Sequence, residues 1–250
     1  MIMLKVHNLV KRFGGLTATD DLSLEVAAGE LHAIIGPNGA GKTTLIHQLS
    51  GEFFPDQGRI VFNGRDITRE APYRRALAGL GRSYQLSSVF SEFTALENVV
   101  LAALAHAGHS FRFWRPVMQE SALTDAAMAA LTEVGLAGQA RQIVANMAHG
   151  ERRQLELAMV LVTKPRLLLL DEPMAGMSHH ESESVVALLS KLKGQYAILL
   201  VEHDMDAVFA LADRITVLVY GRPIATGTPD EIRNNAAVRD AYLGDAEEVI

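Results

Sequence analysis

The stretch from Gly36 to Thr44 constrains this chain more than any other part of its sequence. It reads Gly-Pro-Asn-Gly-Ala-Gly-Lys-Thr-Thr and fits the phosphate-binding loop pattern G-x-x-x-x-G-K-[ST]. Glycines allow positive φ and carry no Cβ, so backbone N–H groups approach phosphate oxygens closely. We expect Lys42 to reach the outer phosphates and the Thr43 hydroxyl to ligate Mg²⁺. The predicted nucleotide-binding residues are Gly36, Asn38, Gly39, Ala40, Gly41, Lys42, Thr43 and Thr44.

The residues around this loop agree with that prediction. Residues 31–35 read as a short buried strand that enters the loop. Leu45, Ile46 and Leu49 then recur at helical spacing, and Gly51 is a plausible C-terminal stop. A helix that begins at the loop adds the positive end of its dipole to the phosphate site. The strand before and the helix after argue against a chance glycine-rich turn.

The composition limits what else the chain is expected to do. Its 250 residues suffice for one large domain or a core with a subdomain, and 49% are hydrophobic. The formal net charge is −6 and no basic run occurs, so we expect no nucleic-acid partner. There is no cysteine, which fits a reducing compartment. Apolar runs are too short to span a bilayer, and the N-terminus lacks a signal-peptide core, so a cytoplasmic protein is predicted.

The patterning divides the chain into three parts. The first third alternates in period two, with strands at 4–6, 22–26 and 59–62, an aromatic-bearing turn at 11–15 and a hairpin turn at Asn63-Gly64. Residues 84–163 turn helical, beginning with a capping box from Thr94 to Glu97. The last third returns to α/β alternation, with strands at 166–170, 197–201 and 215–220 and a second capping box at 228–231. We therefore expect a helical insert in an α/β core.

Two carboxylates follow the apolar run at 167–170. A buried parallel strand delivers its last residues to the carboxyl edge of the sheet, where the phosphate-binding loop also lies. Asp171 is expected to hold Mg²⁺, and Glu172 to orient and polarise the attacking water as general base. Without the phosphate-binding loop, the same residues would read as an ordinary strand followed by an acidic turn.

Residues 147–151, Met-Ala-His-Gly-Glu, stand about twenty positions before Asp171 and resemble the signature motif of ABC-type ATPases. The rest of that family's set of motifs is present in the expected order along the chain. Phe13 resembles the aromatic that stacks on adenine, and Gln85 resembles the glutamine that contacts Mg²⁺ and water. His203 resembles the switch histidine at the γ-phosphate. Taken alone, Phe13 would read as a core aromatic and His203 as a structural histidine.

The resemblance implies a fold, a set of site residues and partners. The fold is α/β: one ABC ATPase domain over 1–250, a P-loop NTPase (RecA-like) core with an antiparallel β-subdomain in 1–85 and 164–250, and an inserted α-helical subdomain in 86–163. ATP and Mg²⁺ are the implied cofactors. The implied catalytic residues are Glu172, His203 and Gln85. The nucleotide-binding set is completed by Phe13, Ala148, His149, Gly150 and Glu151. The metal is held by Thr43, Gln85 and Asp171.

The resemblance also implies partners, because two such domains of the family meet head to tail around ATP. We expect a second ABC ATPase subunit, identical or different, and integral-membrane permease subunits. A solute-binding protein is expected to act indirectly, and the chain to lie on the inner face of the membrane. We expect the surface that couples to the permease to lie near Gln85 and the segment after it. The aromatic and basic loop at 111–115 is a further candidate part of that surface, with local packing as the alternative.

Three positions depart from the family pattern. Ala148 stands where the signature has serine, and His149 where it has glycine. Ser178 stands where many relatives have an aspartate that communicates across the dimer. We expect Gly150 and the following helix to bind phosphate through backbone N–H groups. Ala148 nevertheless gives some support to a catalytically inactive subunit, against which Glu172 and His203 argue.

Several further stretches resemble one subfamily, the importer ATPases for branched-chain amino acids and related amides or urea. The signature variant at 148–156 and the tail at 227–244 carry most of that resemblance. Lipopolysaccharide-export ATPases share part of the tail, so an exporter remains an alternative. A soluble ABC ATPase working on DNA or ribosomes is a second one, although its usual coiled-coil insertion or second cassette is lacking. A different phosphate-loop enzyme, such as a kinase or GTPase, is a third alternative, and a GTPase is disfavoured because no Asn-Lys-x-Asp motif occurs.

Overall fold

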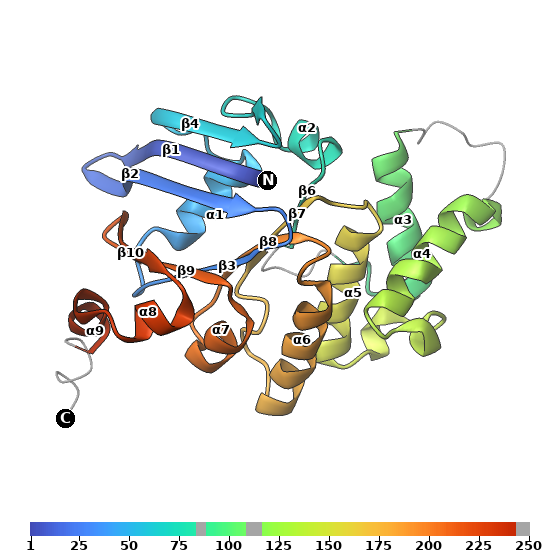
Figure 1. Ribbon diagram of the computed structural model, residues 1–250. Coiled ribbons are helices and arrows are strands. Elements are labelled where there is room, and N and C mark those ends of the chain that lie inside the picture. Colours follow the sequence, from blue (N-terminus) through green and yellow to red (C-terminus); the bar gives the residue numbers. More distant parts are fainter. Residues whose placement is uncertain (84–88, 109–116, 244–250) are drawn as a thin grey trace. The chain divides into compact units, whose positions relative to one another are not determined.

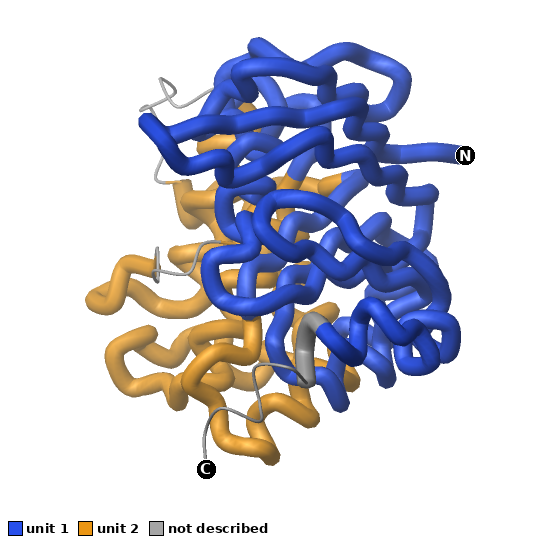
Figure 2. The backbone as a smooth tube through the Cα atoms, turned by 90° about the vertical axis from the view of Figure 1, so that its left-hand side faces the viewer, with its two compact units in different colours: residues 1–80, 166–172, 189–250 blue, residues 81–165, 173–188 orange. Residues whose placement is uncertain are grey.

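The computed structural model describes residues 1–83, 89–108 and 117–243, which fall into two compact units (Figure 2). Unit 1 comprises Met1–Leu80, Arg166–Glu172 and Leu189–Ile250, and unit 2 comprises Gly81–Pro165 and Pro173–Leu188. Each unit is described by itself below. The division expected from the sequence differs mainly at Pro173–Leu188, which it assigned to the core and which clusters with the helices of unit 2.

The first sheet of unit 1 is antiparallel, with strand order β2-β1-β4-β5 (Figure 1). Its strands are β1 (Ile2–Phe13), β2 (Leu16–Ala27), β4 (Gln57–Phe62) and β5 (Arg65–Asp66). The predicted hairpin turn between β4 and β5 is confirmed, because Asn63 and Gly64 both have positive φ, 48° and 78°. The predicted turn over residues 11–15 is wrong in extent. Pairing continues to Phe13↔Leu16, so only Gly14 and Gly15 form the turn.

The second sheet has strand order β10-β9-β3-β8-β7-β6 and holds the predicted central strands. β3 (Leu31–Ile35), β7 (Leu167–Asp171) and β8 (Ala197–Val201) are parallel and buried along their whole length. Their continuous apolar sequences are typical of strands covered on both faces. β9 (Arg214–Val219) runs parallel to β3, while β10 (Arg222–Gly227) is antiparallel to β9, and β6 (Leu80–Arg82) is the other edge.

Five helices accompany the sheets in the described part of unit 1. They are α1 (Lys42–Ser50), α2 (Pro72–Leu77), α7 (Met205–Leu211), α8 (Pro229–Arg233) and α9 (Ala236–Leu243). Side chains of α1 and of both sheets form one apolar core, whose members include Leu4, Leu9, Leu22, Ile34, Leu45, Leu49, Ile60, Leu169 and Leu199. The predicted stop of α1 is confirmed by Gly51, at φ 88°. The predicted capping box of α8 is also present.

A fully buried arginine joins α1 to α2. The Arg75 guanidinium donates to the carbonyls of Gln48 and Leu49, both at 2.7 Å, and to those of Glu70 and Thr68. Burial lowers the pKa of Arg75 to about 10, so the side chain stays charged at neutral pH. It thereby satisfies carbonyls that the C-terminus of α1 leaves without helical partners.

Unit 2 is helical, as the sequence predicts for the middle of the chain. Its long helices are α3 (Ala95–Ala107), α4 (Ser121–Glu133), α5 (His149–Leu161) and α6 (His179–Leu192), of which α6 belongs to unit 2 as far as Leu188. α3, α4 and α5 pack together (Figure 1). The predicted capping box at Thr94 is confirmed, because Glu97 accepts from the Thr94 N–H at 2.7 Å. Within the described residues, no helix has the length and apolar character required to cross a membrane.

Candidate functional site

The predicted phosphate-binding loop connects β3 to α1 in unit 1. Gly36, Gly39 and Gly41 all have positive φ, at 153°, 79° and 99°. A Cβ on Gly41 would lie 2.1 Å from the carbonyl oxygen of Ala18, which is backbone of β2. The turn between β9 and β10 supports the loop from another side, where the Gly221 N–H donates to the Ala40 carbonyl at 3.0 Å. Backbone conformation therefore favours glycine at all three positions, and close backbone packing is a second reason for glycine at position 41.

Lys42 begins α1 and is folded back over the loop. Its Nζ donates to the carbonyls of Gly36 at 2.7 Å and Pro37 at 3.0 Å, and the side chain is buried. Burial lowers the pKa of Lys42, while the charges of Glu172 and Asp171 raise it. Lys42 is therefore close enough to both carboxyl groups at the end of β7 for their charges to affect its pKa. Lys42 begins the helix that follows β3, and the two carboxyl groups lie at the carboxyl end of β7 in the same sheet.

The other predicted loop residues differ in their exposure to solvent. Asn38 and Gly39 are exposed, Ala40 is buried, and Thr43 and Thr44 are partly exposed in the first turn of α1. The N–H groups of that turn have no earlier helical carbonyl to bind, and the positive end of the helix dipole points to the loop. This geometry suits an anion such as a phosphate group.

The two carboxylates occupy different environments. Asp171 ends β7 and is buried, whereas Glu172 is partly exposed and has the unusual φ of 49°. The Glu172 N–H donates to the Val201 carbonyl at 2.9 Å, which holds the residue at the end of β8. A positive φ at a non-glycine residue is strained and occurs often at functional sites. The backbone thus turns Glu172 out of the strand immediately after Asp171.

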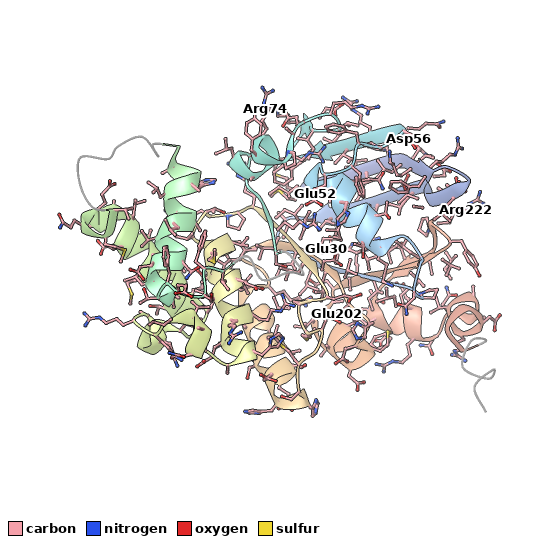
Figure 3. The ribbon with its side chains drawn as sticks, turned by 180° about the vertical axis from the view of Figure 1, so that it is seen from behind. Glu30, Glu52, Asp56, Arg74, Glu202 and Arg222 are labelled. Carbon is pink, nitrogen blue, oxygen red and sulfur yellow. The ribbon has the colours of Figure 1, made fainter. Side chains whose placement is uncertain are left out.

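His203 follows β8, with its side chain 65% exposed. The preceding residue, Glu202, is buried, and its carboxylate accepts from the His203 N–H at 2.9 Å (Figure 3). The same carboxylate lies 3.6 Å from Nδ1 of His203. Asp204 caps α7 by accepting from the Ala207 N–H. The backbone of His203 is therefore held at the sheet edge by the buried Glu202, a residue that the sequence patterns did not single out.

Phe13 ends β1 with 42% of its surface exposed, so it is not a core aromatic. Its ring contacts Phe53 edge to face at 5.4 Å, and Lys11 Nζ lies 5.4 Å from its centroid. Asp56 holds this strand end, accepting from the Arg12 N–H at 2.7 Å and from Lys11 Nζ at 3.0 Å (Figure 3). These bonds, the Arg12 bond foremost, lower the pKa of Asp56. Asp56 is a further supporting residue that sequence reasoning missed.

The predicted signature residues begin α5 in unit 2. Ala148 is the residue before the helix, and His149, Gly150 and Glu151 form its first turn. Glu151 accepts from the Ala148 N–H at 2.9 Å, but alanine has no side-chain oxygen with which to return a bond. Gly150 instead donates to Glu181 at 3.2 Å. The signature segment is therefore a helix N-terminus, as predicted.

Two predicted features, Gln85 and the aromatic loop at 111–115, lie outside the described residues. Ser178, the third departure from the family pattern, lies in unit 2, where its N–H and hydroxyl both donate to Glu181, at 3.0 and 2.7 Å. The spacing Ser178-x-x-Glu181 is a capping-box pattern, so a sequence signal for this contact existed.

Comparison with protein families decides the assignment. The family model described as ABC transporter matches residues 19–175, more than half of the chain. This chain belongs to the ABC transporter family. It is an ABC-type ATPase, so the GTPase and chance-turn alternatives no longer apply. A second model, Branched-chain amino acid ATP-binding cassette transporter, matches residues 222–248.

The chain is similar along almost its whole length to curated ABC proteins. It is 39% identical to the high-affinity branched-chain amino acid transport ATP-binding protein BraF of Pseudomonas aeruginosa, with 98% of each chain covered. Identity to LivG of Escherichia coli K12 is 38% over the same share. The probable LivG of Archaeoglobus fulgidus is 33% identical, with 98% of this chain and 96% of that protein covered.

Solved structures agree with the expected fold class. A nucleotide-free ATP-binding cassette from an ABC transporter superposes with a TM-score of 0.86 at 29% identity, covering 97% of this chain and 99% of that one. The ADP conformation of an ATP-binding cassette gives a TM-score of 0.87 at 28% identity, covering 98% and 99%. The α/β ABC ATPase fold predicted from the motifs is therefore confirmed.

Proposed function

We propose that this ABC cassette powers the import of branched-chain amino acids or related small polar solutes. The C-terminal family match at residues 222–248 and the functions for which the BraF and LivG relatives are named support import of this solute class. The proposal that the chain hydrolyses ATP at this site rests on the grouping of Lys42, Asp171 and Glu172 at one sheet edge. The charges of both carboxylates bear on the pKa of the lysine.

In the proposed reaction Glu172 is the general base. Its carboxylate takes a proton from a water molecule as the water oxygen bonds to the γ-phosphorus of ATP. The bond from that phosphorus to the β,γ-bridging oxygen breaks, which releases ADP and phosphate. Lys42 leaves the loop carbonyls and stabilises the outer phosphates, and His203 donates to the γ-phosphate. We assign Gln85 to the positioning of water, as the family resemblance implies.

The proposed site can hold Mg²⁺ with two protein ligands. Thr43, a partly exposed residue in the first turn of α1, offers a hydroxyl, and Asp171 offers a carboxylate at the end of β7. In residues 1–83, 89–108 and 117–243, no three His, Cys, Asp or Glu side chains gather into a metal-binding group. That suits Mg²⁺, which takes one or two protein oxygens together with phosphate oxygens and water. When bound, the ion would neutralise developing phosphate charge.

We propose that a second cassette completes each nucleotide site. The loop at 36–44 of one subunit binds ATP, and residues 148–151 of the other bind its γ-phosphate through the N-terminus of α5. Each single chain carries one of each element, so a head-to-tail pair forms two sites. The domain organisation proposed from the sequence, with a RecA-like core and a helical insert, accords with this arrangement.

The absence of cysteine from the chain makes the pairing directly testable. One population carries Asn38→Cys and a second carries His149→Cys, each with Glu172→Gln to prevent turnover. We expect ATP to promote a disulfide between the two populations when they are mixed under mild oxidant. Asn63→Cys replaces Asn38→Cys as the matched control. Cross-linking that does not depend on ATP, or that equals the control, would contradict the composite site.

We propose that the permease contacts an exposed apolar surface in unit 2 made by Phe90, Phe93 and Ile143. Ile143 belongs to this surface because it pairs with Thr94, the residue after Phe93. The phenylalanines are 55% and 42% exposed, with ring centroids 5.5 Å apart. Buried Asn98 holds the backbone of Phe90, accepting from its N–H at 2.7 Å and donating to its carbonyl at 3.1 Å. Large exposed apolar groups of this kind mark interaction sites. Docking there would hold the chain on the inner face of the membrane.

Phe93→Ser tests this surface. We expect the variant to keep the ATPase rate of the free cassette and to lose the change in rate that the reconstituted permease causes. Tyr73→Ser, which alters an aromatic 60% exposed in unit 1, is the control and should behave like the parent. Equal permease response in Phe93→Ser and the control would exclude this surface.

A further inference from the structure

One carboxylate in unit 2 joins two segments that are far apart in the sequence. Oε2 of Glu181 accepts from the Ser178 N–H at 3.0 Å and from the Ser178 hydroxyl at 2.7 Å. Oε1 of Glu181 accepts from the N–H of Gly150 at 3.2 Å, thirty-one positions earlier in the chain. The start of α5 and the residue before α6 are thus held by the two oxygens of a single side chain.

The bridge requires an ionised carboxylate. The Ser178 bonds, followed by the Gly150 bond and the neighbouring His149, lower the pKa of Glu181, so it is charged at neutral pH. Glutamine has only one acceptor oxygen, and its amide nitrogen cannot accept from an N–H group. A glutamine in the same orientation would place its amide nitrogen at one of the two positions, and so would lose either the Ser178 bonds or the Gly150 bond.

Gly150 occupies the position at which a helix normally receives its cap. A serine or threonine before a helix accepts from the N–H of the second or third helical residue, and Gly150 is the second residue of α5. Ala148 has no oxygen to do so. Oε1 of Glu181 accepts from that N–H instead, and a Cβ on Gly150 would already lie 3.3 Å from Cγ of Glu181.

We propose that Glu181 is a positioning residue for the signature segment: it supplies from α6 the cap that Ala148 cannot, and it ties Ser178 to the N-terminus of α5. The inference rests on the proposed function for its effect on ATP, because it takes residues 148–151 as the surface that meets the γ-phosphate. With the first turn of α5 fixed in advance, ATP binding does not have to order it.

Glu181→Asp tests the bridge while sparing the cap of α6. Aspartate keeps the charge and stays near Ser178, but it is one methylene shorter and should withdraw from Gly150. We expect the KM for ATP to rise about fivefold, the effect typical of one lost helix cap, with kcat changed less than twofold. Adding Ala148→Ser to Glu181→Asp restores a local cap and should return KM to within twofold of the parent.

Glu183→Asp is the matched control, because Glu183 is an exposed acid on the same helix that lies near His179 and His180. A KM for Glu181→Asp within twofold of the parent, or no rescue by Ala148→Ser, would overturn the inference. Amide hydrogen exchange at Gly150 gives a readout that needs no nucleotide: it should accelerate at least threefold in Glu181→Asp and not in Glu183→Asp. Unchanged exchange would refute the bridge itself. A parent chain without ATPase activity would refute only the proposed function.

Discussion

Replacing Gly41 by alanine perturbs the phosphate-binding loop at a point where it packs closely against the backbone of a strand. The residue has φ 99°, and the added Cβ would lie 2.1 Å from the carbonyl oxygen of Ala18. That oxygen belongs to the backbone of β2, so no flexible side chain can move aside. Either the loop or the strand must shift, and both are packed into the core of unit 1.

Backbone strain and overpacking together set the expected loss in the free energy of unfolding. Left-handed backbone at a non-glycine residue costs about 1–2 kcal/mol. Overpacking against fixed atoms adds about 1–3 kcal/mol. We therefore expect Gly41→Ala to lower the free energy of unfolding by about 2–5 kcal/mol. Gly39→Ala is the matched control, because Gly39 has φ 79° but no atom within 4 Å of the place that an alanine methyl group would take, so only the first term applies.

Urea unfolding followed by circular dichroism measures the difference between these variants. We predict that Gly41→Ala is the less stable variant by at least about 1 kcal/mol, the lower limit of the overpacking term. We also predict that Gly41→Ala binds a fluorescent ATP analogue more weakly than Gly39→Ala. Equal stabilities for the two variants would refute the close approach to β2 as the reason for glycine at position 41.

Three further predictions follow from supporting contacts. Asp56→Ala should raise the dissociation constant of a fluorescent ATP analogue about threefold, because losing roughly 0.7 kcal/mol of support frees the strand end that presents Phe13; an unchanged constant would remove Asp56 from the site. Arg75→Leu should lower the free energy of unfolding in urea by about 3 kcal/mol or more, since it strands buried carbonyls at the end of α1, and a loss under about 1 kcal/mol would contradict that role. Glu97→Gln should destabilise the chain near neutral pH. Because hydrogen bonds from Thr94 lower the pKa of Glu97 in the folded state, that difference should shrink as the pH falls through the lowered pKa, and a pH-independent difference would contradict it.

The features predicted well are those encoded by neighbouring residues. The phosphate-binding loop, the buried strand at 31–35 and the capping boxes at Thr94 and Thr228 depend on local patterns of glycine, apolar and capping residues. Each of these patterns fixes backbone geometry within a few positions. Such signals require no knowledge of the tertiary fold.

The features missed depend on contacts between distant parts of the chain. The end of β1 at Phe13 reads as a turn in the sequence because its pairing with β2 and its support from Asp56 lie outside any short window. β10 contains Pro223, which has no backbone N–H to donate to a neighbouring strand, so no strand was expected there. The capping contact between Ser178 and Glu181 could have been predicted from their spacing. The hydrogen bond from Gly150 to Glu181 could not, because it depends on the packing of α5 against α6 in unit 2.

The central claim, that Glu172 is the general base of an ATPase, is tested most directly by the turnover of Glu172→Gln. The purified parent chain should hydrolyse ATP, and the variant should be slower by at least about a hundredfold, as expected when a general base is removed. Its affinity for ATP should stay within about twofold of the parent, because Lys42 and the loop are untouched, which corresponds to less than about 0.5 kcal/mol. A variant that hydrolyses ATP at nearly the parent rate would contradict the assignment of Glu172.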